Sequence, residues 1–505
     1  MKKSLLFRIV VIVIAFVGSF SVAQAQVTSS AMTGTIRDAK GALPGASIRA
    51  THTPTGTVYG ITTNADGRYT IGGMRVGGPY TVVVSFVGYK AATYNDVYLK
   101  LGENFVLNVT LSDDAANLNE VKVVGNQPNA VMNSNKSGSS TVIARAQIAA
   151  LPTITRSVND LTRLTPQANG TSIGGGNYRS NNFSVDGANF NNQFGIGQNI
   201  PAGGSPISID ALEQISINVT PYDVRQSGFV GGSVNAVTRS GTNKFFGNAF
   251  FTLRGEENQG KRIGDTYRIS DASIQPLDEK QYGFSFGGPI IKDKLFFFVN
   301  AEKKITTGPG TQRLAATPEL PYTAANPNVV QASASFLNEV SALLKSRYNY
   351  ETGPYQGYSQ VSDNEKLFAR LDWNISKNHR FSVRYNQVES QSPSSASTSV
   401  SGSAVTGALG YGNVRSGTTR TAGLPFSNSN YYQAQNLYSG VAELNSSFGS
   451  KFTNVLRATY SHQNDPRTSD SSPFPLVDIL DGSQTTSSAG NVLTTFGYEA
   501  FTYGN

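Results

Sequence analysis

Apolar and polar residues alternate along much of the second half of the chain. Residues 366–375 read KLFARLDWNI, in which every second residue from Leu367 to Ile375 is apolar and the residues between them are mostly polar. Successive side chains of a strand point to opposite faces, so this stretch predicts a strand with one apolar and one polar face. After SKNH at 376–379, residues 380–386 (RFSVRYN) repeat the alternation. The two stretches predict a β-hairpin.

The same alternation recurs in five further stretches: KFFGNAFFTLR (244–254), YGFSF (282–286), LFFFVNAE (295–302), YSGVAELNSSF (438–448) and FTNVLRATYSH (452–462). The connections between these strands are alternately long and short: long at 255–279, 304–363 and 389–431, and short at 288–294, 376–379 and 449–451. A soluble sandwich has no reason for this regularity, whereas a transmembrane barrel has tight periplasmic turns and long outer loops. We therefore predict that residues 243–505 form an antiparallel transmembrane β-barrel, with Leu371 facing lipid and Arg370 facing the lumen.

The first folded unit covers residues 27–112. Short strand-like runs such as YTVVVSFVGY (80–89) are separated by turns such as DAKGALPG (38–45) and TNADG (63–67). Short strands with turns at this spacing predict a small β-sandwich.

The next unit, residues 146–242, mixes helix and strand signals. A helix is predicted over 158–164, capped by Thr155 or Ser157 and ending before a proline. Strand–turn–strand patterns follow in the remainder of the unit. We expect an α+β domain.

The N-terminus has the features of a secretory signal peptide, residues 1–25. Basic residues precede the apolar stretch Ile9 to Val17, and the small-residue site AQA follows at 23–25. A membrane-spanning helix is the alternative, but the apolar run has only about half of the ~20 residues that a span needs. Export without a helical anchor leaves a soluble secreted protein or an outer-membrane barrel.

Composition excludes several functional classes. The 505-residue chain has no cysteine, three histidines and a net charge of +8 that is not gathered into a basic block. Nucleic-acid binding is not expected. A zinc peptidase needs clustered ligands, and His52, His379 and His462 lie far apart in the sequence. We therefore expect no catalytic residues, no metal and no cofactor.

Residues 118–125 read LNEVKVVG, a β-favouring run inside the linker 113–145. Its position after one folded unit and before the next is unusual for a strand. The candidate site residues are Leu118, Asn119, Glu120, Val121, Lys122, Val123 and Val124. The alternatives are a last strand of the sandwich or a plain linker.

These units together resemble TonB-dependent outer-membrane receptors of the Oar-like kind. GTIRDAKGALPGASI (34–48) and the two following turn–strand motifs resemble the carboxypeptidase-regulatory-like domain. NNFSVDGA (181–188) and GGSVNAVTRSGTN (231–243) resemble the plug domain. GGPIIKDKLFFFVNAE (287–302) resembles an early barrel strand pair. The SusC-like importers, which pair with a surface lipoprotein, share this layout.

The resemblance implies a function and a set of partners. Residues 118–124 would be the TonB box, an unpaired peptide that adds to the edge of a partner's sheet. The implied function is energy-coupled uptake of a ligand across the outer membrane, with a TonB-type periplasmic protein, outer-membrane lipid and, in the SusC-like case, a surface lipoprotein as partners. The ligand is a glycan, a peptide or a chelate. A surface adhesin or a structural outer-membrane barrel without active transport is the alternative.

The number of strands leads to one more expectation. Plugged transporter barrels have about 22 strands, whereas we recognise seven here, with an eighth beginning at 494–505. We therefore expect an open-edged sheet, belonging to an incomplete gene product or a fragment.

Overall fold

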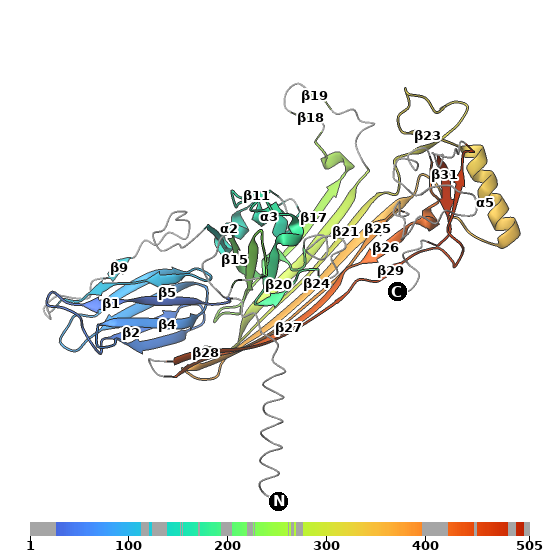
Figure 1. Ribbon diagram of the computed structural model, residues 1–505. Coiled ribbons are helices and arrows are strands. Elements are labelled where there is room, and N and C mark those ends of the chain that lie inside the picture. The colour runs from blue at the N-terminus through green and yellow to red at the C-terminus, as the bar shows by residue number, and fades with distance from the viewer. Residues whose placement is uncertain are drawn as a thin grey trace, which may run out of the picture.

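The protein folds into a β-sandwich, an α+β domain and a long curved sheet that carries a small lobe (Figure 1). The structure is a computed structural model that describes residues 27–112, 121–123, 139–151, 153, 155–169, 172–192, 205–219, 226, 228–260, 262–263, 267–268, 276–395, 423–448, 452–482 and 491–498. The predicted signal peptide lies outside these residues. No helix within them is long and apolar enough to cross a membrane.

The N-terminal unit is the predicted sandwich, built from two sheets. One sheet has the order β4–β1–β7, with β8 also paired to β1, and the other has the order β3–β2–β5–β6–β9. The bounds are β1 (Ser30–Arg37), β2 (Ser47–His52), β3 (Thr57–Thr62), β4 (Arg68–Met74), β5 (Gly77–Ser85), β6 (Ala92–Leu99), β7 (Asn104–Val106), β8 (Val109–Thr110) and β9 (Val121–Val123). Alternate residues such as Tyr80, Val82 and Val84 of β5 are fully buried between the sheets.

We call residues 139–240 the inner domain, because they pack on the inward face of the long sheet. Their main sheet has the order β10–β15–β16–β13–β14. The elements are β10 (Ser140–Ala144), α2 (Arg145–Ala150), α3 (Val158–Thr162), β11 (Ala168–Asn169), β12 (Ser172–Ile173), η1 (Tyr178–Ser180), β13 (Asn182–Val185), β14 (Ala188–Asn189), η2 (Ile209–Ala211), β15 (Leu212–Asn218) and β16 (Ser233–Thr238). Ser157 caps α3, as predicted, by accepting from the amide of Asn159 at 3.2 Å.

One boundary differs from the prediction. β10 lies in the predicted linker, yet it pairs with β15 over its whole length. Ile143 of β10 is buried in the core of the inner domain. The burial of this residue places the strand in the domain, a long-range effect that local composition does not reveal.

The long sheet is antiparallel and contains the predicted barrel strands in the predicted order. The seven predicted strands are β17 (Phe246–Gly255), β20 (Asp278–Ile291), β21 (Leu295–Pro309), β24 (Ser359–Asn374), β25 (His379–Ser394), β27 (Asn436–Phe448) and β28 (Phe452–Asn464). Two short strands that were not predicted, β26 (Tyr431–Ala434) and β29 (Arg467–Thr468), extend the sheet beside β25. Within the described residues β17 and β28 each pair with one barrel strand only, so the sheet is open, as expected. Connections of three to four residues at 292–294 and 375–378 alternate with long ones, which confirms the predicted alternation.

The two faces of the sheet also agree with the prediction. Leu371 and Trp373 project outward and are exposed, whereas Arg370 and Asp372 project inward and are buried. Inward apolar residues such as Phe298 belong to the same buried cluster as the core of the inner domain. The barrel strands and the inner domain therefore share one core.

A compact lobe, which we call the outer lobe, stands at the end of the sheet where the long connections lie. It contains β22 (Leu314–Ala316), β23 (Val329–Ser333), α5 (Ala334–Tyr348), η6 (Ser427–Ser429), β30 (Val477–Leu480) and β31 (Val492–Phe496). Leu337, Tyr350, Phe426 and Phe496 form part of its core. The remaining elements, η3 (Glu256–Asn258), β18 (Arg262–Ile263) and β19 (Tyr267–Arg268), lie in the connection after β17.

The outer lobe corrects one prediction. Residues 494–505 were expected to begin an eighth barrel strand, but β31 pairs with β30 instead. The amide of Gly497 donates to the Tyr350 hydroxyl at 3.1 Å, and the Phe496 side chain is buried in the lobe. A short apolar run can join either sheet, and the lobe provides the buried partner. Residues 499–505 lie outside the described residues.

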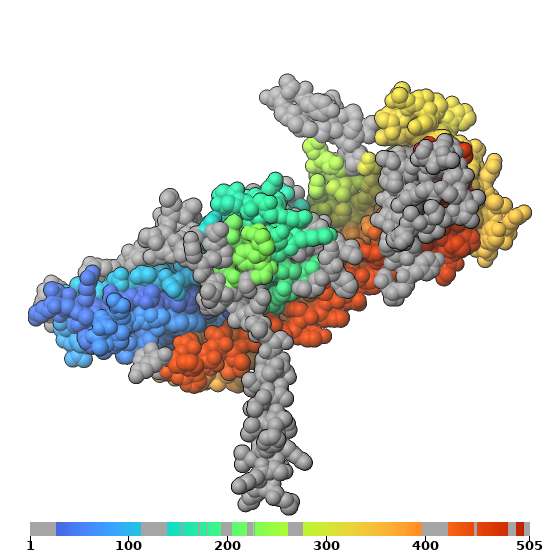
Figure 2. All heavy atoms as spheres, in the orientation of Figure 1, coloured from blue at the N-terminus to red at the C-terminus, as the bar shows by residue number. Residues whose placement is uncertain are grey.

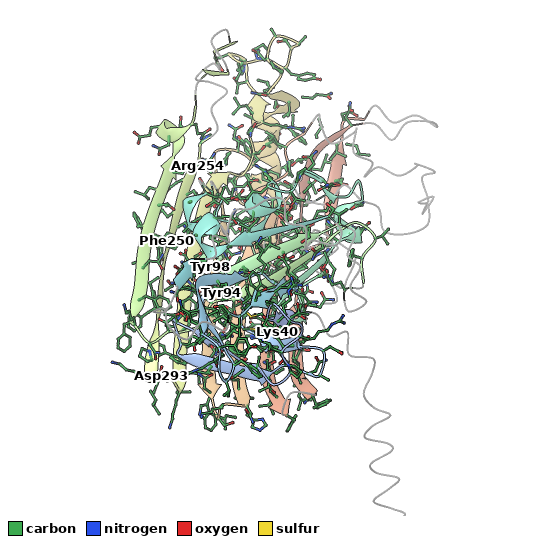
Figure 3. The ribbon with its side chains drawn as sticks, turned by 90° about the vertical axis from the view of Figure 1, so that its left-hand side faces the viewer. Lys40, Tyr94, Tyr98, Phe250, Arg254 and Asp293 are labelled. Atoms are coloured by element: carbon green, nitrogen blue, oxygen red, sulfur yellow. The ribbon has the colours of Figure 1, made fainter. Side chains whose placement is uncertain are left out.

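The sandwich and the outer lobe occupy opposite ends of the long sheet (Figure 1). Figure 2 shows the sandwich against one end of the molecule, beside β28, and α5 at the other end. In Figure 3, Asp293, in a short turn, lies near the sandwich, while Arg254 lies toward the opposite end of β17. Tight turns mark the periplasmic side of transmembrane barrels, so the sandwich lies at the end of the sheet that the sequence predicts to be periplasmic.

Candidate functional site

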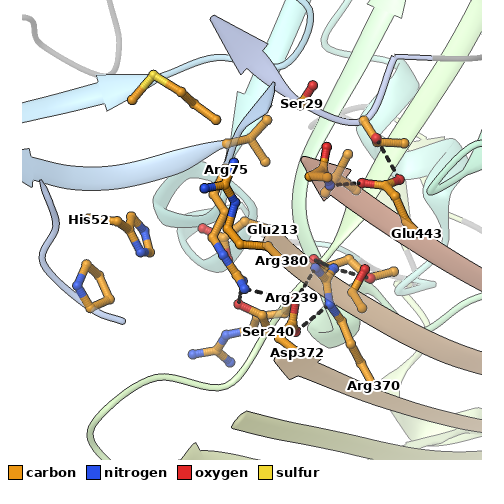
Figure 4. A pocket seen from close by; sticks show the side chains of 18 of the residues that line it. Ser29, His52, Arg75, Glu213, Arg239, Ser240, Arg370, Asp372, Arg380 and Glu443 are labelled. Carbon is orange, nitrogen blue, oxygen red and sulfur yellow. Dashed lines mark hydrogen bonds and ion pairs between the residues drawn. The ribbon is translucent and has the colours of Figure 1, made fainter. Parts of the chain in front are cut away.

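A cavity of about 330 Å³ lies where the sandwich, the inner domain and the barrel sheet meet (Figure 4). The sandwich contributes His52 and Arg75 to its lining, the inner domain contributes Glu213 and Arg239, and the barrel sheet contributes Asp372, among others. Both signs of charge are present in the lining. Charged side chains that are withdrawn from water need partners, and their pairing defines the site.

Arg370 and Asp372 form the centre of the barrel's contribution. They lie two residues apart on β24, so both point inward. Arg370 donates from Nε and Nη2 to the Asp372 carboxylate at 2.8 and 2.9 Å. Its Nη1 donates to the carbonyl oxygen of Thr238, the last residue of β16, at 2.8 Å. One guanidinium group thus joins the barrel to the inner domain.

The inner domain inserts a tight turn among these charges. Asp186 and Gly187 connect β13 to β14 with φ values of +51° and +82°, as a two-residue type I′ turn requires. Asp186 Oδ2 lies 2.9 Å from Nε of Arg384 on β25. Its Oδ1 accepts from the amide of Thr238 at 3.0 Å. The Asp-Gly pair in the motif NNFSVDGA therefore serves the turn and also provides a carboxylate for the barrel.

Glu443 on β27 is the second barrel carboxylate of the site. Arg457 of β28 donates from Nε to Glu443 Oε2 at 2.8 Å, and Nη2 of Arg384 lies 3.5 Å from the same oxygen. Thr28, just before β1 of the sandwich, also donates to Oε2 at 3.0 Å. The carboxylate therefore contacts two barrel strands and the sandwich.

A separate buried pair lies between other strands. Nζ of Lys366 is 2.6 Å from Oε1 of Glu302, and these side chains are 4% and 0% exposed. Ser208 of the inner domain donates to Glu302 Oε2 at 2.7 Å, and Gln281 donates to Oε1 at 3.0 Å. Desolvation largely offsets the attraction within a buried pair, but loss of one partner costs ~3–5 kcal/mol. These pairs therefore fix where the inner domain sits more than they add net stability.

The sandwich reaches the site through Arg75, which lies between β4 and β5. Its Nη2 is 3.1 Å from Asp372 Oδ1, and its Nη1 donates to the Ser240 hydroxyl at 3.0 Å. Arg75 thus contacts the barrel and the end of the inner domain at once (Figure 4).

Burial shifts the titration of groups around the cavity. Burial, together with the nearby Arg75, lowers the pKa of His52 to about 3, so this imidazole is neutral and its Nδ1 lies 2.7 Å from the Thr55 hydroxyl. Burial, aided by Arg145, lowers the pKa of Arg239 to about 10. Burial raises the pKa of the Glu213 carboxyl although Arg239 opposes this shift. Burial at the junction is therefore the main cause of all three pKa shifts.

The candidate TonB box lies only partly within the described residues. Leu118, Asn119, Glu120 and Val124 lie outside them. Residues Val121–Val123 form β9, which pairs in parallel with β6 of the sandwich. The segment was expected to be unpaired, and this is a difference from the sequence-based expectation. A β-favouring segment so close to an open sheet edge can add to that edge with little loop-closure cost.

The three histidines do not come together. His52 is in the sandwich, His379 contacts the Ser446 hydroxyl at 2.9 Å, and His462 stacks on Tyr438 in the barrel sheet. Among the described residues, no three His, Cys, Asp or Glu side chains are grouped in a way that could hold a metal ion.

Sequence reasoning placed the barrel residues of the site on the polar face but did not identify their partners. Arg370 and Arg384 are inward positions of predicted strands, so their direction was predictable. Arg75 carried no signal, because it is a lone arginine in the glycine-rich turn GGMRVGGP at 72–79. The one available clue was that barrel charges facing a filled lumen need partners.

Comparison with known proteins agrees with this architecture. Residues 31–112 match the family described as Carboxypeptidase regulatory-like domain, and residues 237–505 match the family described as Outer membrane beta barrel domain. The TonB-dependent transporter Oar of Myxococcus xanthus is 32% identical over 308 residues, which cover 57% of this chain and 28% of that protein. The chain thus spans less than a third of that relative's length.

Two solved structures of outer-membrane proteins match part of this chain. The outer membrane transporter YddB of Escherichia coli matches 72% of this chain and 43% of its own, with a TM-score of 0.43 and 13% identity. The siderophore receptor PirA of Acinetobacter baumannii matches 70% of this chain and 42% of its own, with a TM-score of 0.39 and 16% identity.

The barrel match covers more than half of the chain and begins at residue 237, at the end of the inner domain. The regulatory-like match coincides with the observed sandwich. The predicted resemblance to Oar-like TonB-dependent receptors is therefore confirmed, and this outer-membrane protein belongs to the outer membrane beta-barrel domain family.

Proposed function

We propose that this protein is a receptor that imports a ligand across the outer membrane by energy-coupled transport. The inner domain acts as the plug of the barrel, and a periplasmic TonB-type protein moves it by pulling on residues 118–124. Binding and movement, without covalent chemistry, suffice for this function. The proposed ligand is a glycan, a peptide or a chelate that the outer loops capture.

The observation that carries the proposal is the way the inner domain is attached to the barrel strands. A structural barrel could fill its lumen with apolar side chains alone. Here the turn at Asp186 and the hydroxyl of Ser208 meet charged barrel residues, Arg384 and Glu302. Water that enters a gap can solvate such groups again, so a polar contact can part and re-form with less penalty than an apolar one. The polar part of the interface therefore favours a domain that moves, while the apolar core that it shares with the barrel strands holds it in place at rest.

The proposed motor contact is strand addition. An extended peptide can pair its backbone with the edge of a partner's sheet, and its alternate side chains give selectivity. Residues Val121–Val123 already adopt the extended conformation in β9. The TonB-type protein would therefore exchange one sheet edge for another without refolding the segment.

The experiment replaces Val123 in the complete receptor. Val123→Pro removes a backbone donor and fixes φ, so strand addition should fail. Energy-dependent uptake, measured with a panel of radiolabelled ferric chelates, oligosaccharides and peptides, should collapse while binding of the same probe at the cell surface persists. Val123→Thr, which keeps the amide and the β-branched shape, is the matched control and should import normally.

A second measurement tests the motor contact directly. A purified periplasmic domain of the TonB-type protein should bind the complete receptor and its Val123→Thr variant, but not the Val123→Pro variant. Uptake that persists in the Val123→Pro variant would contradict energy coupling through this segment. Surface binding without any uptake in the unmodified receptor would favour the adhesin alternative.

A further inference from the structure

We propose that the carboxypeptidase regulatory-like sandwich has a function of its own, as a gate that is latched across the periplasmic end of the barrel. The inference rests on the proposed import function, because only a transporter needs an exit that opens. In the latched state the sandwich holds the inner domain and the barrel strands together, and it must detach before the inner domain can move.

The sandwich contacts the barrel near the short turns and, through Thr28, at Glu443 within β27. Asn374, the last residue of β24, donates to the Thr57 hydroxyl at 3.0 Å. The guanidinium of Arg380, the second residue of β25, lies 4.2 Å from the centre of the Tyr59 ring. These contacts join the first half of β3 to the rim of the barrel. A module that was merely tethered would have no reason to match the rim in this way.

The same sandwich also holds the inner domain. Gln214 of β15 donates from Nε2 to the carbonyl oxygen of Leu99 at 3.0 Å and accepts from the amide of Leu101 at 2.9 Å. These two hydrogen bonds use both the nitrogen and the oxygen of the buried Gln214 side-chain amide. Asn235 of β16 donates to the carbonyl oxygen of Val27. The sandwich therefore bridges the plug strands and the barrel rim.

Arg75 is suited to be the releasable part of the latch. Its partner Asp372 is already paired bidentately with Arg370, so Asp372 keeps a cation when Arg75 leaves. Arg75 itself is 16% exposed at its side chain, and water can solvate it as it withdraws. Release of the sandwich therefore leaves no unpaired buried charge in the barrel, which is what a reversible gate requires.

The position of β9 connects the gate to the proposed motor contact. β9 is the edge strand of the sandwich and pairs with β6, whose last residue, Leu99, is one of the two that bond to Gln214. A pull on residues 118–124 therefore acts first on β9 and the sandwich edge and then on the bonds to the inner domain. The latch would open before the inner domain moves.

A reversible cross-link tests the gate without knowledge of the ligand. A Cβ atom placed on Gly72 of β4 would lie 3.8 Å from the Cβ atom of Thr453 on β28. This separation is within the ~3.5–4.5 Å of a disulfide. Residues 1–505 contain no cysteine, so Gly72→Cys with Thr453→Cys introduces one defined pair in this part of the receptor. In the complete receptor, mild oxidation should cross-link the double variant and neither single variant.

The readout is KCl conductance of the purified complete receptor in planar lipid bilayers. Urea, added stepwise, loosens the inner domain and opens a conducting path. Oxidation of the double variant should lower the frequency of opening at a fixed urea concentration by about tenfold or more, and a reductant should restore it. In neither single variant should the reductant change the frequency of opening.

A substitution of Arg75, the latch residue, should have the opposite effect on the conductance. Arg75→Ala should raise the frequency of opening by about tenfold, because a hydrogen-bonded ion pair between the sandwich and the barrel is lost. Arg49→Ala is the matched control, since Arg49 is an exposed arginine on β2 of the same sandwich, and it should leave the conductance unchanged.

Two results would overturn the gate. The first is failure of the introduced thiols to cross-link when each is reactive toward maleimide. The second is equal conductance of the oxidised and reduced double variant. A gate that fails while Val123→Pro still abolishes uptake leaves the import function standing. A disulfide that controls conductance while Val123→Pro imports normally leaves the gate standing without the motor contact.

Discussion

The two faces of the barrel sheet place opposite chemistry on the same strands. On β24 the outward Leu371 and Trp373 are 43% and 47% exposed, whereas the inward Arg370 and Asp372 are 9% and 1% exposed. In a soluble protein the apolar residues would be buried and the charged ones exposed. The inversion shows that each face has a different solvent: lipid outside, and another protein domain inside.

The two faces of the barrel sheet also differ in the interactions that stabilise them. The outward face is stabilised by its match to lipid, an effect that depends on depth and not on any single neighbour. The inward face depends on specific partners, because a buried charge without one is strongly unfavourable. Substitutions on the two faces should therefore differ in how much they cost and in what restores stability.

The largest effect is expected on the inward face. Arg370→Leu should destabilise the complete receptor by ~3–5 kcal/mol, because the buried Asp372 loses its bidentate partner and keeps only Arg75, and the Thr238 carbonyl loses a donor. A low cost was expected from sequence only if Arg370 had no partner in the inner domain, and the structure shows that it has one. Urea titration of the refolded receptor, followed by its heat-modifiable mobility, measures the change.

Two further variants test whether loss of the Arg370–Asp372 pair causes the loss of stability. Arg370→Lys keeps the charge but not the bidentate geometry, and it should lose less stability. Arg370→Leu combined with Asp372→Leu should recover only part of the loss, since it removes the buried carboxylate of β24 but also the barrel partner of Arg75. A cost below about 1 kcal/mol for Arg370→Leu would mean that the inward charges are solvated.

The next effect concerns the outward face. Leu371→Arg should cost ~2–4 kcal/mol near the middle of the bilayer, because a charge is placed in lipid. Leu371→Met, an apolar change of similar volume, is the control and should cost less than about 1.5 kcal/mol. Urea titration of the refolded receptor also measures this cost. Tolerance of arginine at this position in lipid vesicles would show that the outward face is covered by protein.

A smaller effect is expected at the turn that enters the inward face. Gly187 has φ +82°, so Gly187→Ala should cost ~1–2 kcal/mol through backbone strain. An added Cβ would also press on the Arg457 guanidinium, which must move aside. Asp186→Asn is the informative companion, because asparagine tolerates the left-handed conformation but removes the charge near Arg384. Limited proteolysis of the complete receptor would report loosening of the inner domain.

The smallest effect concerns pH at the junction of the inward face with the sandwich. The pKa of His52 is about 3, below its ordinary value of 6.5, so the unfolded chain takes up a proton first as the pH falls. This contribution to stability is complete above pH 6.5 and is lost as the pH falls from 6.5 toward 3.

The expected loss is about 1 kcal/mol between about pH 6 and pH 5. The urea midpoint for unfolding of the sandwich within the complete receptor measures it. His52→Gln should abolish this part of the pH dependence and leave the rest. A midpoint that is equally sensitive to pH in both proteins would show that His52 is solvated.

Local signals predicted a good part of this fold. The alternation in residues 366–386 identified both faces of β24 and β25, because side-chain direction follows directly from strand geometry. Ser157 identified the start of α3, since a cap needs only its own helix.

The features that sequence reasoning missed depend on contacts between distant residues. β31 was assigned to the barrel, but it joins the outer lobe around Tyr350. β9 was expected to be unpaired, but it lies on β6. Short strands of this kind can pair with the free edge of any nearby sheet. The local sequence does not indicate which sheet edge lies close to the strand in the folded protein.

The sequence by itself determined the order of the three units, the faces of the barrel strands and the side of the membrane on which the short turns lie. Each follows from periodicity, turn chemistry and connection length, which are properties of neighbouring residues. Only the tertiary structure decided that Arg75 of the sandwich meets Asp372 of the barrel, and that Asp186 of the inner domain meets Arg384. Charge pairing is short-range in space but independent of separation along the chain, so the partners become known only when the chain has folded.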